Sequence, residues 1–529
     1  MHRPPTAESE SAAGIAAARP ALGPRFAAEL PGARAAVLTR LWRALAHEPL
    51  PWIVRREPSG DGLTLRLADG RRLHGPRSDP YATADRVRTV DLDGTAYDDP
   101  ARLTTALAVP HGEGLAAELA DSTASLALSR ADQEPGGESD AQEPDGREPD
   151  TQALDVREPD GRRAREWPAH DWEWEQRVVD GHPYHPNCRS RPGFSVAEQL
   201  AYGPEHRPPP VRLGLLPVPA GECLVSGGWP AGLRDGGRLM IPVHPWQAAH
   251  VLERSCAEGI AAHPLMSLRT LAVPGGPHVK TALSTRLTSS VRDISVGSVT
   301  ASAALSAFGE SLAERTDGLL HTTRSLGAVT ANSPDLAAVL RESPAVYAGP
   351  GEHVVPVAAL ATTGLPSSPA WLAEFTRLAL TVGLRLLEQG VALEAHGQNL
   401  LVVLSASGAP VRLVYRDLAD IRVSPARLAR HGVAVPELPA RILTDDVPAL
   451  RRKLFGSLVA GALAATVGGG EALGAALAAA VPGLPDTADL RALCEEPVPV
   501  KALTLMRLSP DGSGDRWARL PNPLAGHAF

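Results

Sequence analysis

Apolar residues recur at helical spacing in several parts of the chain. Between residues 33 and 47 they return every three or four positions, at Leu38, Leu41, Trp42 and Leu45, which predicts a helix. Further helices are expected at 99–108, 115–128 and 369–390, and a mostly helical region at 443–481. Short apolar runs predict strands at 52–56, 63–67, 279–283 and 500–508. Residues 23–128 are therefore expected to form an N-terminal α+β lobe.

The segment Glu394–Leu418 predicts a β-hairpin, because the apolar runs 400–404 and 411–415 are separated by turn-forming residues. The open end of an antiparallel hairpin brings its strand ends together. Polar residues flank those ends: Glu394, His396, Gln398, Asn399, Arg416 and Asp417. Carboxylate and amide oxygens are the ligands that Mg²⁺ prefers. The alternative is a solvated loop in which Arg416 and Asp417 form a local ion pair.

Basic and hydroxyl side chains gather between residues 267 and 295. Ser267 and Arg269 precede a Pro-Gly-Gly-Pro turn, and Lys280 lies on the expected strand 279–283. Thr288 is suited to cap a short helix that would place Arg292 one turn further on. A helix N-terminus with cations nearby suits a phosphate or a carboxylate. The alternative is a capped helix that carries basic surface residues.

The segment 181–194 is expected to be an irregular loop, because its two prolines exclude a continuous helix. It contains two histidines and two arginines: His182, His185, Arg189 and Arg191. This set suits an anion better than a metal, because the arginines would repel a cation and a third local ligand is missing. The alternative is a loop packed by its aromatic residues, with the histidines bonded to backbone.

Charge is concentrated in one segment of the chain. Residues 131–160 hold eleven acidic residues and two arginines, a net charge of −9 within a chain whose formal net charge is −8. The remainder is close to neutral, which argues against a nucleic-acid partner. A segment so charged and so poor in apolar residues is expected to be a disordered insertion, here placed at 129–165. Residues 1–22 are also expected to be disordered.

The cysteines and the apolar segments indicate the compartment. The four cysteines are scattered and form no CxxC motif, which fits a reducing cytoplasm. The N-terminus lacks the apolar core of a signal peptide. The most apolar stretch, 458–481, is rich in Ala and Gly and is expected to be a buried helix pair and not a membrane span.

Four motifs occur in a fixed order along the chain. They are GHPYHPNCRSRPGF at 181–194, SLRT…K…TSSVRDIS within 267–295, EAHGQNLL with YRDL within 394–418, and KALTLMRL with PNPL within 501–524. Together they resemble the NRPS-independent siderophore synthetases, the aerobactin-synthetase-like IucA/IucC family, from about residue 172 to residue 524. The resemblance implies an α+β fold shaped like a hand, with thumb, fingers and palm. It also implies a homodimer.

The resemblance further implies that ATP and Mg²⁺ are used to adenylate a carboxylate such as citrate, which an amine or hydroxyl then attacks to give an amide or ester. On the matching positions, ATP phosphates would be held by His182, His185, Arg189, Ser267, Arg269 and Lys280. Mg²⁺ would be held by Glu394, Asn399 and Asp417. The carboxylate would be oriented by Thr288, Arg292, His396 and Gln398. Arg189 departs from the family's usual Lys, so a planar fork replaces a point charge.

This interpretation divides the chain into an ATP-binding region at 166–390 and a palm at 391–529. The acid is left open between citrate, a citrate half-amide, 2-oxoglutarate and a succinyl-diamine. A kinase-like phosphotransferase is one alternative, because an Asn before a hairpin and an Asp after it also place Mg²⁺ in kinase-like folds. A non-catalytic citrate or siderophore carrier is the other.

Overall fold

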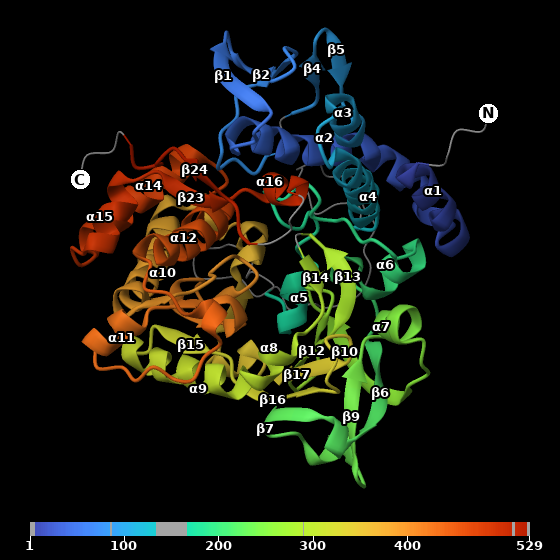
Figure 1. Cartoon of the computed structure of the whole chain (residues 1–529), viewed down its shortest axis with the longest axis vertical. Helices are drawn as coiled ribbons and strands as arrows, with labels where there is room; N and C mark the ends of the chain where they lie inside the picture. Colours follow the sequence, from blue (N-terminus) through green and yellow to red (C-terminus); the bar gives the residue numbers. More distant parts are fainter. Residues whose placement is uncertain (1–5, 85–86, 134–166, 289, 510–513, 526–529) are drawn as a thin grey trace, which may run out of the picture.

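Helices with one apolar stripe pack on sheets in three lobes of the protein (Figure 1). The computed structural model describes residues 6–84, 87–133, 167–288, 290–509 and 514–525. The strands pair antiparallel except for β15 (Leu320–Thr322), which pairs parallel with β21 (Pro410–Tyr415). Helices and mainly antiparallel sheets confirm the expected α+β class.

The N-terminal lobe, blue in Figure 1, combines four helices with a five-stranded meander. Its helices are α1 (Ala7–Ala18), α2 (Gly23–His47), α3 (Pro100–Leu107) and α4 (Gly112–Ala131). Its strands, in sheet order, are β1 (Ile53–Ser59), β2 (Gly62–Leu67), β3 (Arg72–Pro76), β4 (Val90–Leu92) and β5 (Thr95–Tyr97). The apolar stripe of α2 is buried, as its spacing predicts.

The expectation of disorder at 1–22 is wrong for the described part of that segment. Helix α1 begins after a capping box at Thr6 and buries Ile15 completely. An ion pair between Arg34 and Glu8, 2.5 Å long, joins it to α2. The acidic insertion also begins later than expected, because 129–131 belong to α4 and Asp132 pairs with Arg19 at 2.7 Å. The rest of the insertion, from 134 onward, lies outside the described residues.

The second lobe is built on a nine-stranded sheet. In sheet order its strands are β7 (Leu224–Gly227), β16 (Ser325–Thr330), β17 (Ala337–Arg341), β12 (His278–Thr281), β11 (Thr270–Ala272), β10 (Ala257–Pro264), β6 (Val211–Pro219), β9 (Arg238–Val243) and β8 (Arg234–Asp235). The associated helices are α5 (Asp171–Gln176), α6 (Val196–Tyr202), α7 (Pro245–Gln247), α8 (Val296–Thr300) and α9 (Ser302–Ala313). Lys280 lies on β12, an interior strand that is paired on both sides by β17 and β11.

The third lobe contains the largest hydrophobic core. Its four-stranded sheet runs β15, β21, β20 (Leu400–Leu404), β18 (His353–Pro356). Its helices are α10 (Pro369–Gln389), α11 (Pro425–Arg430), α12 (Val447–Ser457), α13 (Ala464–Val467), α14 (Gly470–Ala480), α15 (Ala488–Glu495) and α16 (Leu503–Leu508). Two small ladders, β19 (Val391–Ala392) with β22 (Arg422–Val423) and β23 (Val498–Lys501) with β24 (Trp517–Leu520), complete it.

Two boundaries differ from those expected. Strands β15 and β18 precede residue 390 yet join β20 and β21 in one sheet, so the expected division at 390 does not separate two sheets. The expected strand 500–508 is a strand only to Lys501 and then becomes α16. The hairpin β20–β21 and the helix α10 form as predicted.

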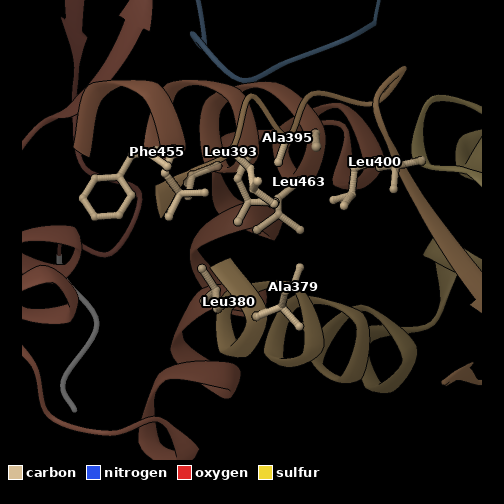
Figure 2. Packing of buried hydrophobic residues seen from close by; sticks show 14 of the residues in the cluster. Ala379, Leu380, Leu393, Ala395, Leu400, Phe455 and Leu463 are labelled. Carbon is tan, nitrogen blue, oxygen red and sulfur yellow. The ribbon is translucent and has the colours of Figure 1, made fainter. Parts of the chain in front are cut away.

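The segment that leads into the hairpin is anchored by alternating apolar residues. Figure 2 shows its buried side chains Leu393, Ala395 and Leu400 packed with residues of α10 (Ala379 and Leu380), of α12 (Phe455) and of the helical turn after α12 (Leu463). Glu394 and His396 alternate with these buried residues and are themselves partly exposed. Core packing thus fixes the backbone from which the polar side chains project.

The apolar stretch 458–481 contributes a π-helical turn (Leu458–Leu463), α13 and α14 to this core, which confirms the expected burial. Among the described residues, no single helix combines the length and the apolar character of a membrane span. The pair Val447–Val467 and Gly470–Gly483 meets both criteria only when taken together across a bend of 114°.

Candidate active site

A cavity of about 130 Å³ lies where the nine-stranded sheet meets the hairpin. Three cations and one carboxylate of the hairpin end line it: Arg269, Lys280, Arg341 and Asp417. A second acidic residue, Asp293, and the hydroxyl residues Ser298, Ser302, Ser306, Thr323 and Ser325 complete the polar lining. Nζ of Lys280 lies 2.6 Å from Oδ2 of Asp417, and the guanidinium of Arg341 lies 3.4 Å from Oδ1. Cations and hydroxyl donors are suited to hold phosphate groups.

Burial sets the protonation behaviour of these groups. Burial lowers the pKa of Lys280 to about 7, against the opposing effect of Asp417. Burial and the neighbouring Arg292 lower the pKa of Arg269 to about 10. Burial alone would raise the pKa of Asp417, but Lys280 and Arg341 hold it well below its usual range. At neutral pH the carboxylate is therefore ionised, and the charge of Lys280 is sensitive to pH.

Arg269 is oriented by backbone. Its Nη1 donates to the carbonyls of Arg292 and Asp293, at 2.9 and 2.6 Å. Ser267 lies at the preceding turn, where its Oγ accepts from the amide of Thr270 at 3.1 Å. The predicted phosphate-side residues Arg269 and Lys280 thus lie together at the cavity, with Ser267 on the turn before them.

Thr288 does not cap a helix, so this expectation is wrong. It follows β13 (Leu283–Leu287) in the turn of a hairpin whose second strand is β14 (Ser290–Arg292), and its φ is +56°. Left-handed backbone is rare for a β-branched residue and is a mark of local strain. Arg292 still reaches Thr288, because its Nη2 donates to the threonine Oγ1 at 2.7 Å. The hairpin brings together the pair that was expected on a helix.

Arg292 and His396 face the same charged groups. Burial lowers the pKa of Arg292, and the charges of Glu394 and Asp417 oppose that effect, so both carboxylates lie within electrostatic reach. Burial also lowers the pKa of His396, which keeps its ring neutral. Nδ1 of His396 accepts the amide proton of Gln398 at 3.3 Å, so Nε2 carries the ring proton. His396 can therefore donate a hydrogen bond to a bound acid.

Glu394 is held by two lysines that no sequence motif had suggested as its partners. Its Oε1 accepts from Lys453 of α12 at 3.1 Å and from Lys501 of β23 at 3.0 Å. Burial alone would lower the pKa of Lys501, but the negative charge of Glu394 outweighs this effect and raises the pKa to about 12. The backbone amide of Glu394 donates to the buried Tyr415 hydroxyl at 3.1 Å. Glu394 and Asp417 thus belong to two different ion-pair clusters.

This arrangement bears on the expected magnesium ligands. Across the described residues, no group of three or more His, Cys, Asp or Glu side chains is arranged to hold a metal. Mg²⁺ usually retains waters and binds through one or two carboxylates with substrate phosphates, so a dedicated cage is not required. Asp417 fits that role because it lines the cavity beside the cations. Both carboxylates are engaged in ion pairs, so what separates them is position: Asp417 lines the cavity, whereas Glu394 and Asn399 do not. Nδ2 of Asn399 donates to the Glu394 carbonyl at 3.5 Å.

The loop 181–194 is irregular, as expected, but its members differ in environment. His185 is buried, and burial together with Arg292 lowers its pKa to about 3. His182 lies beside it, with ring centroids 6.1 Å apart. Arg189 is 6% exposed, donates to the carbonyls of Val178 and Val179, and pairs with Glu205 at 3.3 Å. Arg189 is thus engaged within the protein, whereas His185 lies within electrostatic reach of Arg292.

The fold is shared with solved siderophore synthetases. A petrobactin biosynthesis protein, AsbB, from Bacillus anthracis str. Sterne superposes with a TM-score of 0.71 at 17% identity, covering 95% of this chain and 98% of that one. ATP-bound aerobactin synthetase IucA from a hypervirulent Klebsiella pneumoniae pathotype gives 0.67 at 19% identity, covering 93% and 99%. These similarities confirm the hand-like α+β fold implied by the sequence.

Residues 170–362 match the model of the IucA/IucC family, which confirms the resemblance found in the sequence. Residues 369–516 match a second family, the ferric iron reductase FhuF-like transporters. A citryl-spermidine/3,4-dihydroxybenzoyl-citryl-spermidine:spermidine ligase of Bacillus anthracis is 26% identical over 47% of this chain and 51% of its own. Staphyloferrin A synthase of Staphylococcus aureus is 22% identical over 53% and 57%. The chain thus spans about half the length of the curated relatives it matches.

Proposed function

We propose that this protein is an ATP-dependent ligase of siderophore biosynthesis that joins a carboxylate, citrate or a related acid, to an amine or hydroxyl. The observation that carries the proposal is the cavity in which Arg269, Lys280 and Arg341 face Asp417, with Arg292 and His396 close by. Cations for a triphosphate and a separate arginine for a carboxylate are what adenylation requires. The relatives named for ligating citryl groups to amines support it.

In the proposed reaction the acid oxygen attacks the α-phosphorus of ATP and pyrophosphate leaves. The amine or hydroxyl then attacks the acyl carbon, and AMP leaves. Arg269, Lys280 and Arg341 hold the phosphates, while Arg292 forks onto the acid and His396 Nε2–H donates to its oxygen. Mg²⁺ held by Asp417, with Asn399 or Glu394, would supply neutralisation of phosphate charge.

The second matched family raises a different activity, ferric iron reduction. The matched segment 369–516 contains a single cysteine, Cys494, and the described residues offer no cluster of metal-ligating side chains. The ligase proposal therefore accounts for more of the observed site.

A panel of carboxylates and polyamines, incubated with ATP and Mg²⁺, tests the proposal through nucleotide products and product mass. AMP with pyrophosphate and a condensed product are expected for at least one pair. ADP would instead indicate a kinase-like phosphotransferase. ATP left intact with every pair would indicate a non-catalytic carrier.

A further inference from the structure

A short helix, α5, joins the two sides of the candidate site. Asp171 and Glu175 are four residues apart and therefore share one face of this helix. Oδ2 of Asp171 accepts from His278 of β12 at 2.7 Å and from Ser343 at 2.8 Å. In Figure 1, α5 lies near the centre of the molecule, beside the strands that carry the phosphate-side residues.

Glu175 makes contacts in two directions. Its Oε2 accepts the amide proton of Met266 at 2.8 Å, immediately before Ser267. Its Oε1 pairs with Arg416 Nη1 at 2.7 Å, immediately before Asp417. The Glu175 and Arg416 side chains are only 2% and 7% exposed. The buried carboxylate of Glu175 therefore holds the backbone of Met266, next to Ser267, and the side chain of Arg416, next to Asp417.

Arg416 extends this connection into the hairpin end. Its Nε donates to the Gln398 carbonyl at 2.9 Å, and its backbone amide donates to the Asn399 carbonyl at 3.0 Å. The local Arg416–Asp417 ion pair considered from the sequence is replaced by this longer-range pair. Arg416 thereby spans the two strand ends that carry Asn399 and Asp417.

We infer that Glu175 is a positioning residue: through Met266 and Arg416 it sets the distance between the phosphate-side residues and Asp417. The inference rests on the proposed function, because it assigns Glu175 to the binding of ATP with its metal. Removing the charge of Glu175 leaves the buried guanidinium of Arg416 without its paired carboxylate. Asp171 is another carboxylate within electrostatic reach of Arg416. Arg416 then moves from its place, and Asp417 moves with it.

Binding of ATP with and without metal tests the inference without requiring turnover. The dissociation constant of ATP is measured by calorimetry in excess Mg²⁺ and in EDTA, for the wild type, Glu175→Gln and Arg416→Lys. The metal-dependent gain in affinity is expected to fall tenfold or more in Glu175→Gln. In Arg416→Lys, which keeps the buried charge but loses the simultaneous contacts, it is expected to fall by a smaller factor. Combining the substitutions should add little, because both act through one connection.

Asp489→Asn is the matched control, because Asp489 forms a similarly buried pair with Arg427 at 2.6 Å, with side chains 1% and 9% exposed. It is expected to lower the melting temperature and to leave both dissociation constants unchanged. A Glu175→Gln protein that behaves in the same way would overturn the inference. If Glu175→Gln does not fold, Arg416→Lys decides. The inference is then overturned if the metal-dependent gain in ATP affinity of Arg416→Lys equals that of the wild type. A wild type that binds no ATP under either condition would overturn the proposed function itself.

Discussion

Lys280 and Asp417 are 137 residues apart in the chain, yet Nζ of one lies 2.6 Å from Oδ2 of the other. The contact joins an interior strand of the nine-stranded sheet, β12, to the end of the hairpin. It places a pH-sensitive cation against the carboxylate best placed to hold a metal. Both partners line the cavity, so nucleotide binding and this ion pair are expected to be linked.

ATP affinity is predicted to fall as pH rises above 7. The pKa of Lys280 is lowered to about 7, so its ammonium is charged below that pH and neutral above it. Above pH 7 the phosphates of ATP lose the attraction of this ammonium. The affinity for ATP then falls by at most about tenfold per pH unit. Lys280→Arg remains charged and should flatten the profile. Dissociation constants of Mg·ATP between pH 6 and 9 check this, and equal slopes in both proteins would contradict it.

Glu394→Gln is predicted to destabilise the fold. The substitution leaves Lys453, whose side chain is 3% exposed, without one of its two carboxylate partners, and Lys501 without its closest one. Breaking a buried ion pair from one side costs about 3 kcal/mol of unfolding free energy.

Urea denaturation measures the effect of Glu394→Gln. Arg491→Ala is the control, because its pair with Asp486 is mostly exposed and should contribute less than about 1 kcal/mol. Unchanged stability of Glu394→Gln, together with loss of the Mg²⁺ dependence of ATP binding, would instead make Glu394 a metal ligand.

Arg292→Lys is predicted to impair use of the acid more than use of ATP. The guanidinium is held by Thr288 Oγ1 at 2.7 Å and can present a planar fork that an ammonium cannot. Loss of one charge-assisted hydrogen bond costs about 1.5–3 kcal/mol, or about ten- to a hundredfold in kcat/KM for the acid. Separate titrations of acid and ATP check the assignment. A larger effect on ATP would place Arg292 among the phosphate-side residues.

Removal of residues 136–164, replaced by a short Gly-Ser linker, is predicted to leave activity and melting temperature nearly unchanged. The segment is too acidic and too poor in apolar residues to build a core. The deletion must begin after Gln133, because Asp132 pairs with His206 at 2.9 Å and Gln133 donates to the Glu205 carbonyl at 3.0 Å. A cooperative loss of folding would show that the segment is structural.

Local patterns predicted the hairpin β20–β21 and α10 correctly, because apolar periodicity and turn residues are properties of neighbouring positions. They wrongly predicted a helix at Thr288, because a hydroxyl residue before a polar run suits a helix N-cap as well as a hairpin turn. Sequence spacing also held no signal for the partners of Glu394, because Lys453 and Lys501 approach it only through the packing of α12 and β23. Glu175 was missed for the same reason, since its partners lie 91 and 241 residues away.

Strands β15 and β18 lie within the segment matched by the IucA/IucC family, and β20 and β21 lie within the segment matched by the second family. Among the described strands, β15 and β18 pair only with β21 and β20, whereas β20 and β21 also pair with each other. Expression of either segment alone would leave open sheet edges, which favour aggregation. Chimaeras between relatives should accordingly exchange residues 170–516 as one unit. A junction between residues 362 and 369 would pair β15 and β18 of one protein with β21 and β20 of another.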